Sequence, residues 1–368
     1  MRLRTSLSIA LTAAALAATA GAYAADEPSA SLKAGKPDIK SAGPLAFGPD
    51  GILLVGDTAG AAVFAIDTGD RTPAAEKKAV KLEKVGQAVA AKLGTDASKV
   101  LINDVAVNPV SGKVYLSVSR GRGPDASPVI LRLTADGGLE ELALDNVKFA
   151  KAEIPNPPAP GATGRGVASR AESITDLAFA DGRVFVAGLS NEEFSSRLMA
   201  IPFPFAGAPD AAAIEIYHGA HGRFETKSPI RTFVAYKINN EPYLMAAYTC
   251  TPLVKVPVAE LKPGAHVKGT TIAELGNRNR PLDMIVYQKD GKDFLLLANS
   301  DRGVMKIQTE GAAAAEPITK RVAGTQGTPY KTVEGLKGVL QLDQLDAGHA
   351  VVLVDDGGTL SLQTIDLP

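Results

Sequence analysis

The sequence predicts an all-β protein, a β-propeller most simply counted as six blades, and two observations lead to this prediction. First, six segments repeat one pattern: an apolar run, a turn rich in Gly, Asp, Asn or Pro, and a second apolar run that ends in a polar cluster. Such a pattern is typical of two strands joined by a tight turn. Second, another apolar run follows these segments and supplies a third strand. Repeated antiparallel units of this length favour a propeller.

The six units are distributed over most of the chain. The paired runs are 44–58 (PLAFGPDGILLVGDT), 103–119 (NDVAVNPVSGKVYLSVS), 174–190 (ITDLAFADGRVFVAGLS), 231–249 (RTFVAYKINNEPYLMAAYT), 282–300 (LDMIVYQKDGKDFLLLANS) and 338–356 (GVLQLDQLDAGHAVVLVDD). The third runs are AAVFAIDT, VILRLTA, SRLMAIPF, PLVKVPV, GVMKIQT and TLSLQTIDL.

The first 24 residues have the pattern of a secretory signal peptide. Arg2 and Arg4 precede an apolar run from Leu7 to about Ala20, and the tripeptide AYA then ends at Ala24. A positive start, a short apolar run and a small-x-small site are typical of cleaved export signals. The alternative, a membrane anchor, needs a longer run. We therefore expect cleavage after Ala24 and a periplasmic or secreted protein.

The remaining chain divides into a short start and one domain. We expect a flexible start over 25–43, a single propeller domain over 44–368, and insertions in that domain at about 72–98 and 145–170. Apolar residues at helical spacing predict a short helix in the first insertion, and the run PNPPAPGATGRG predicts a long surface loop in the second. Since the last unit ends on its third strand, we expect residues 30–42 to close the ring by pairing with 359–367.

Composition excludes several classes of protein. The chain has 39 basic and 40 acidic residues; cleavage would remove two Arg and leave 37 against 40, a net charge of about −3. Without a basic block, a nucleic-acid partner is not expected, and no other stretch is apolar enough to span a membrane. One Cys excludes an internal disulfide framework, and the absence of Trp argues against WD-type propellers. We expect a monomer.

Polar residues gather in the loops of one predicted face, which we call the site face. It carries the loops that enter each innermost strand and the loops between second and third strands. Asp104, Asp176 and Asp283 occupy matching positions just before innermost strands. Converging carboxylates suit Ca²⁺. The alternative is that they cap hairpins by accepting bonds from nearby backbone amides.

A second set of residues has the chemistry of a transition-metal site. His218 and His221 enter the fourth unit, and Cys250 lies in the loop between that unit's second and third strands. Imidazole and thiolate ligands suit Cu or Zn. The alternative is a polar loop beside an inert thiol.

A third set is basic. Arg278 and Arg280 lie in the loop that enters the fifth unit, and Asn299 and Arg302 lie in that unit's next site-face loop. Guanidinium groups hold carboxylates and phosphates by paired hydrogen bonds, so these residues are candidates for binding an anionic ligand. The alternative is that they pin two blades together.

The repeats LAFGPDGILLVGD and DLAFADGRVFVAG resemble those of secreted six-bladed propellers. This loose class includes NHL-repeat proteins, gluconolactonase-like lactonases and the β-chain of quinoprotein amine dehydrogenases. The lactonases bind a divalent cation with acidic and amide side chains at the mouth of the channel. By position, the resemblance implies Asn103, Asp104, Glu172, Asp176 and Asp283 as the corresponding candidates, with Ca²⁺ as the ion.

These observations lead to one functional hypothesis and two alternatives. The first is an exported module that binds a protein or a small anionic ligand through its polar face. The second is a divalent-metal-dependent hydrolase, lactonase-like or esterase-like, that uses the carboxylates at the channel mouth. The third is a copper-linked or redox-partner protein, which depends on the His and Cys residues. No nucleophile elbow or haem-attachment motif is present.

Overall fold

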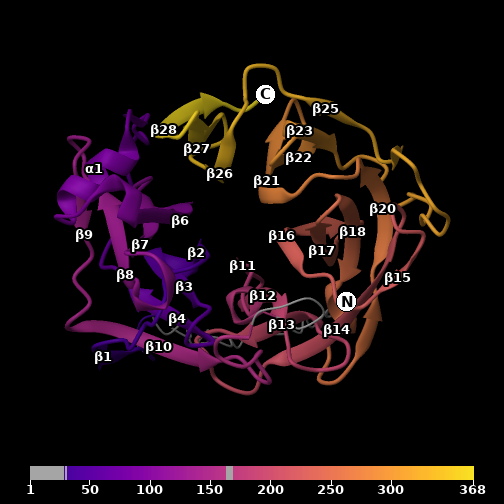
Figure 1. Ribbon diagram of the computed structural model, residues 1–368, viewed down its shortest axis with the longest axis horizontal. Coiled ribbons are helices and arrows are strands. Elements are labelled where there is room, and N and C mark those ends of the chain that lie inside the picture. Colours follow the sequence, from indigo (N-terminus) through magenta and orange to yellow (C-terminus); the bar gives the residue numbers. More distant parts are fainter. Residues whose placement is uncertain (1–28, 30, 163–168) are drawn as a thin grey trace, which may run out of the picture.

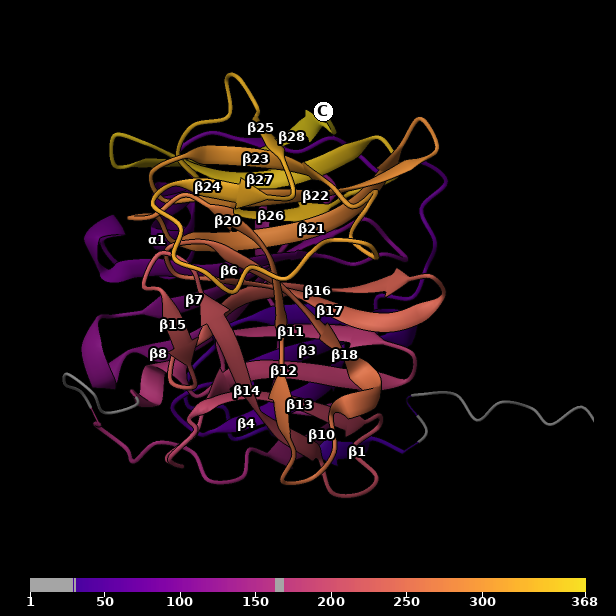
Figure 2. The ribbon, with the colours of Figure 1, turned by 90° about the vertical axis from the view of Figure 1, so that its right-hand side faces the viewer.

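The computed structural model describes residue 29 and residues 31–162 and 169–368, and it confirms the six-bladed β-propeller. Six mainly antiparallel sheets are arranged in a ring, with their innermost strands toward its centre (Figure 1). In the side view of Figure 2 the strands run between the two faces of the molecule. The predicted signal peptide lies outside the described residues. No helix within the described part of the chain has the length and apolar character needed to cross a membrane.

We number the blades by the chain order of their innermost strands. Blade 1 comprises β2 (Leu45–Phe47), β3 (Ile52–Asp57), β4 (Ala62–Asp67) and β10 (Val147–Glu153), with β1 (Lys33–Gly35) outside. Blade 2 comprises β6 (Val100–Val107), β7 (Val114–Arg120), β8 (Ser127–Leu133) and β9 (Leu139–Glu141). Blade 3 comprises β11 (Asp176–Ala180), β12 (Arg183–Leu189), β13 (Ser196–Pro202) and β14 (Asp210–His218), with β15 (Arg223–Glu225) and β19 (His266–Lys268) added.

The other three blades follow the same plan. Blade 4 comprises β16 (Ile230–Ile238), β17 (Glu241–Tyr248), β18 (Pro252–Pro257) and β20 (Thr270–Leu275), with β24 (Thr325–Gly327) outside. Blade 5 comprises β21 (Pro281–Lys289), β22 (Lys292–Asn299), β23 (Gly303–Gln308) and β25 (Tyr330–Thr332). Blade 6 comprises β26 (Val339–Gln344), β27 (His349–Asp356), β28 (Thr359–Asp366) and β5 (Lys81–Leu82). The helices are α1 (Val85–Lys92) and the 3₁₀ turns Pro49–Gly51, Ala97–Lys99, Gly123–Asp125, Arg170–Glu172 and Val258–Glu260.

The blades do not follow one another around the ring in chain order. The innermost strand of blade 1 packs between those of blades 2 and 3, and the innermost strand of blade 2 packs against that of blade 6. Figure 1 shows β2, β3 and β4 lying between β6–β8 and β11–β13. Around the ring the order is therefore 2, 1, 3, 4, 5, 6.

This order makes blades 1 and 6 composite, and it overturns two predictions. The outer strand of blade 6 is β5, where Leu82 is the register partner of Leu362, so the predicted closure by residues 30–42 is wrong. Within that segment, residues 33–35 instead form β1, which pairs with β10. The segment 145–170 is also not all loop, because β10 pairs with β4 and completes blade 1. Each pairing covers an exposed strand edge with a segment that the repeat pattern does not mark.

The crossover from blade 1 to blade 6 is fixed to blade 2 by a buried carboxylate. Asp70 is 4% exposed and accepts hydrogen bonds from Asn108, Ser111, Lys113 and Tyr115 of the β6–β7 hairpin. Burial alone would raise the pKa of Asp70, but these bonds outweigh it and lower the pKa. The crossover thus remains bound to the surface of blade 2.

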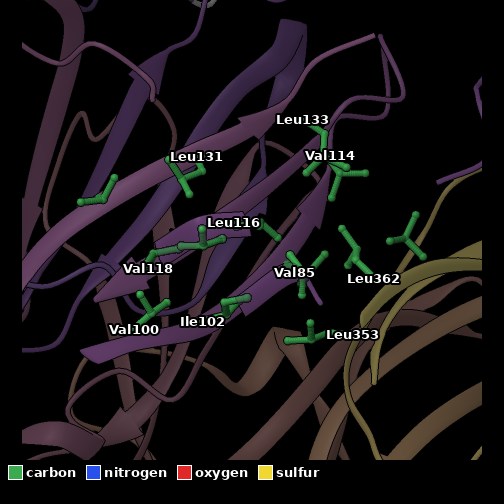
Figure 3. Packing of buried hydrophobic residues seen from close by; sticks show 14 of the residues in the cluster. Val85, Val100, Ile102, Val114, Leu116, Val118, Leu131, Leu133, Leu353 and Leu362 are labelled. Atoms are coloured by element: carbon green, nitrogen blue, oxygen red, sulfur yellow. The ribbon is translucent and has the colours of Figure 1, made fainter. Parts of the chain in front are cut away.

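The inserted helix fills the gap between blades 2 and 6. Val85 and Val89 of α1 are fully buried in one cluster with Leu116 of blade 2 and with Leu353 and Leu362 of blade 6. Figure 3 shows Val85 lying close to Leu362 and Leu353 beside the strands of blade 2. The predicted short helix is therefore present, and its apolar residues seal a blade junction.

Candidate functional site

The innermost strands line a central channel that contains four carboxylates. Its volume is about 280 Å³, and its walls include Asp104, Asp176, Asp283 and Asp343. A β-bulge lies within β6, between Ile102 and Asp104, and another lies at the start of β21, between Pro281 and Asp283, so these aspartates lie inside their strands rather than before them. Such a bulge redirects the side chain that follows it. The structure thus brings the three aspartates predicted from the sequence to one channel and adds Asp343.

All four aspartates make the same pair of hydrogen bonds. In each, Oδ1 accepts from the amide of the next residue, at 2.8 Å for Asp104 and Asp176 and at 2.7 Å for Asp283 and Asp343. Each Oδ2 accepts from an innermost strand of the neighbouring blade, and the donors are the amides of Leu45, Phe233, Leu342 and Val107. The carboxylates therefore join blades 2 to 1, 3 to 4, 5 to 6 and 6 to 2.

Burial raises the pKa of every member of this group. The pKa of Asp176 and that of Asp343 are each raised to about 6 by burial. The pKa values of Asp104 and Asp283 lie well above their usual range, because burial is reinforced by repulsion from the other channel carboxylates. Two effects therefore oppose each other at every channel aspartate. Hydrogen bonds from backbone amides favour the ionised carboxylate, and burial favours the protonated form.

The channel carboxylates do not form a compact ligand set. Across the described residues, the ligand atoms of His218, His221 and Cys250 form the one group of three or more His, Cys, Asp or Glu side chains within 4.8 Å of one another. Of the other calcium candidates, Asn103 donates to Ala42 O and Ser119 Oγ, and Glu172 is paired with Arg231. The calcium site remains a prediction.

The His and Cys residues, in contrast, converge. The two imidazole rings have centroids 3.9 Å apart, and both lie beside Cys250, which comes from the β17–β18 loop of the next blade. Metal–ligand bonds of about 2.0 to 2.3 Å place neighbouring ligand atoms roughly 3 to 4 Å apart. Small side-chain rotations would bring these three atoms around one ion.

Glu225 orients both imidazoles. Its two oxygens lie 2.9 Å from Nδ1 of His218 and 2.7 Å from Nδ1 of His221. An ionised carboxylate only accepts, so each Nδ1 donates, and in a neutral ring the lone pair is then on Nε2. Ser228 Oγ also donates to Glu225, at 2.6 Å. Burial alone would raise the pKa of Glu225, but the bonds from His218, Ser228 and His221 hold it well below the usual range.

The Nε2 atom of His218 has no hydrogen-bond partner although it is buried. The side chain of His218 is 3% exposed. An unpaired buried acceptor is uncommon because it loses its bond to water without replacement. The carboxylate–histidine arrangement with a free Nε2 is the one that metal-binding histidines adopt.

The backbone at Cys250 is held in an unfavourable conformation. Cys250 and the β-branched Thr251 have φ values of 63° and 60°, a region that favours glycine. The Cys250 amide donates to Asn279 O at 2.7 Å, and Thr251 Oγ1 donates to Gly276 O at 2.6 Å. These bonds hold the thiol beside the histidines at the expense of backbone strain.

The basic loops lie next to this cluster. Asn279 Nδ2 donates to Asn299 Oδ1 at 2.9 Å, and Arg302 Nη2 donates to Asn277 O at 3.2 Å, so the two loops are joined. Asn299 is 4% exposed and bonded within the fold, which gives it a structural role. Arg278 and Arg280 are exposed. Anion binding by these arginines remains a prediction.

Two candidate functional residues, Glu225 beside the histidines and Asp343 in the channel, were not predicted from the sequence. Glu225 follows His221 by four residues, and the resulting H-x-x-H-x-x-x-E spacing is a signal that a carboxylate returns to the histidines on β15. Asp104 and Asp283 directly follow the bulges in β6 and β21, whereas Asp343 lies two residues beyond Gln341, the residue that follows the bulge in β26. Its position in the repeated unit therefore does not match theirs.

Comparison with known proteins adds a fold-level likeness. No family model and no curated protein matches the chain. Among solved structures, it is similar to a putative oxidoreductase (glucose dehydrogenase) from Thermus thermophilus, with 13% identity, 91% of this chain and 100% of that chain covered, and a TM-score of 0.35. A PQQ-bound aldose sugar dehydrogenase from Streptomyces coelicolor shows 14% identity, 91% and 97% coverage, and a TM-score of 0.33.

A third similar structure is not that of a dehydrogenase. The extracellular domains 1–2 of Drosophila semaphorin 1b match with 11% identity, covering 92% of this chain and 87% of that chain, at a TM-score of 0.39. Similarity at this level is shared by proteins of unrelated function and carries no argument about chemistry. The chemistry of this six-bladed propeller depends on its own side chains.

Proposed function

We propose that this protein is a metal-binding β-propeller that holds a soft transition-metal ion, copper or zinc, between His218, His221 and Cys250. The observation that carries the proposal is the buried, unpartnered Nε2 of His218, on a side chain that belongs with His221 and Cys250 to one group whose ligand atoms lie within 4.8 Å of one another. Metal coordination supplies the partner that this nitrogen lacks. The broader hypothesis of a ligand-binding module on the site face then has a specific ligand, the ion itself.

The donor set favours copper or zinc over calcium. Two imidazole nitrogens and one thiolate are soft or borderline ligands, whereas calcium prefers oxygen. In the neutral form of each imidazole, Glu225 holds the proton on Nδ1 and so leaves the Nε2 lone pair directed away from the carboxylate. Metal binds to the deprotonated form of each ligand, so the Cys250 thiol releases its proton when the ion binds.

The first experiment measures the affinity of the metal-free protein. The protein is titrated with Zn²⁺, and separately with Cu⁺ in the absence of oxygen, in competition with a chromophoric chelator. We expect one ion to bind per chain. Cys250→Ser and His221→Gln should each weaken binding strongly. The other two histidines of the chain, His266 and His349, provide matched controls, and His266→Gln should bind as the parent does. Equal affinity in Cys250→Ser and the parent would contradict the proposal.

A second experiment tests the orienting carboxylate. Gln at position 225 offers one acceptor oxygen and one NH₂ donor, so one histidine would turn to the tautomer that carries its proton on Nε2 and cannot bind metal. We expect Glu225→Gln to weaken metal affinity by roughly 10- to 100-fold, the usual effect of losing such a partner. Thermal melting with and without ion checks that the variant is folded. Unchanged affinity in folded Glu225→Gln would show that Glu225 has no orienting role.

A further inference from the structure

Among the described residues, three side chains form the candidate metal site. Within the described residues, no further His, Cys, Asp or Glu side chain belongs to the group formed by His218, His221 and Cys250. The nearby Glu274 is 1% exposed and accepts from the Gly219 amide at 2.5 Å, so it is occupied within the fold. Structural zinc is almost always four-coordinate. Two nitrogens and a thiolate in a three-coordinate set are instead well suited to Cu⁺, which accepts low coordination numbers and favours thiolate.

The three ligands differ sharply in their access to solvent. The side chain of His218 is 3% exposed, whereas that of His221 is 44% exposed. Cys250 is partly buried. The open position of a bound ion is therefore on the side of His221, and another molecule's donor atom reaches the ion from that direction.

His221 is also the ligand that leaves with the least disturbance. It lies between Ala220 and Gly222 in the turn after β14, where Gly222 has a φ of +70°. Its ring is held by one hydrogen bond, to Glu225. When that bond breaks, Glu225 keeps His218, Ser228 and Arg223 as partners, so no buried charge is left unpaired.

From these three observations we infer that the site is an exchange site, which receives Cu⁺ and passes it to an incoming donor with His221 as the departing ligand. The inference rests on the proposed metal-binding function. In the first step the copper–donor bond forms and the copper–Nε2 bond of His221 breaks. Further donor atoms of the acceptor then replace Nε2 of His218 and the Cys250 thiolate, and the thiolate takes up a proton. The ion remains Cu⁺, and no electron is transferred. His218 and Cys250 hold the ion until the incoming ligand has bound, so free Cu⁺ is not released.

The test measures the rate at which copper-loaded full-length protein transfers Cu⁺ to the chelator bicinchoninate in the absence of oxygen. The absorbance of the coloured copper–chelator complex reports the transfer. Exchange by attack of the incoming ligand predicts a rate that rises with chelator concentration. His221→Ala should still bind copper but transfer it roughly tenfold faster or more, since most affinity changes at one site appear in the release rate. His218→Ala should instead lose equilibrium binding. His266→Ala should match the parent.

The outcomes separate the two proposals. If the parent binds no copper, the proposed function fails. If copper is bound but its transfer rate does not depend on chelator concentration, and His221→Ala transfers at the parental rate, the ion is held permanently and only the exchange inference is overturned. If His221→Ala does not fold, His221→Gln replaces it, because its amide preserves size and polarity at an exposed position.

Discussion

At the scale of single residues, strain and unpaired groups identify the site. The hairpin of β16 and β17 turns through Asn239 and Asn240, both at positive φ, as expected for a tight turn. The next hairpin on the same blade uses Cys250 and Thr251 in the same region of φ. Such strain persists where surrounding bonds enforce it and is concentrated at functional sites. Here it positions a thiol that a glycine would not supply.

Replacing Cys250 by glycine should raise the stability of the metal-free protein and lower its affinity for metal. Cys250→Gly removes the strain of a left-handed non-glycine residue and should make the metal-free protein more stable by about 1 kcal/mol. The same change should abolish metal binding, because it removes the thiolate. Thermal melting and copper titration measure the two effects.

The control for this prediction is Cys250→Ser, which keeps the side chain's size and its strain. It should lose affinity without gaining stability. If Cys250→Gly melts below Cys250→Ser, the cysteine backbone is not strained, and the link between strain and site fails.

At the scale of elements, the two-residue strand β5 and the seven-residue strand β10 complete blades to which they are not adjacent in the chain. β5 completes blade 6 and β10 completes blade 1, and each is far in the chain from the strands it joins. The end of β4 and the start of β10 lie side by side, since Ile66 is the register partner of Phe149. Leu142 and Leu144, which follow β9, pack in the same cluster as Phe47 of β2. Strands β2, β3 and β4 thus lie in space between blade 2, which ends with β9, and β10.

We therefore predict that residues 40–67 can be moved within the chain while all six blades are kept, with only the edge strand β1 omitted. In the rearranged protein the chain starts at residue 69, and the moved segment follows residue 144 and leads by a short turn into residue 147. Antiparallel neighbours can be joined by a tight hairpin, and all sheet partners of the moved strands are kept. We expect a melting temperature within several degrees of the parent and unchanged copper affinity.

The control for the rearrangement is the parent chain with a Gly-Ser linker inserted after residue 144. It shows whether this junction tolerates an insertion. If the control folds and the rearranged chain does not, the crossover from blade 1 to blade 6 is required for folding. The hydrogen bonds of Asp70 that fix this crossover would then be needed for the fold to form.

At the scale of the whole molecule, the channel carboxylates connect blades and make stability depend on pH. The pKa values of Asp176 and Asp343 are raised to about 6, whereas the pKa of an aspartate in the unfolded chain is about 3.9. Between these values the folded state binds more protons than the unfolded state, so stability rises as pH falls from 6 toward 4. Glu225 acts in the opposite sense, because its pKa is lowered and its contribution is lost below about pH 4.

We accordingly expect the melting temperature to rise as pH falls from 7 to about 5, and to fall again below pH 4. Together the two aspartates should contribute on the order of a few kcal/mol at most. Thermal melts between pH 4 and pH 8 measure the profile. Asp343→Asn, which removes one of these titrating groups, should show a smaller rise. A parental melting temperature that increases from pH 5 to pH 7 would contradict this account.

Local patterns in the chain were sufficient to predict the propeller, its six units and the types of chemistry available. Alternating apolar runs and turn residues are local signals, since the side-chain period of a strand and the conformation of a turn depend on neighbouring residues. The same holds for the inserted helix. The patterns also marked His218, His221 and Cys250 as residues of suitable chemistry, although their spacing along the chain does not fix their distance in space.

Which of these residues meet, and how the ring is ordered, follows from the packing of whole sheets. The strand β5 is two residues long, and β10 lies in a segment that the prolines after it mark as irregular, so neither carries a strong pattern. Their pairing is selected by exposed edges that are distant in the chain. The convergence of His218 with Cys250 depends in the same way on the packing of blade 3 against blade 4, because contacts between residues far apart in the chain are not encoded in either residue's local sequence.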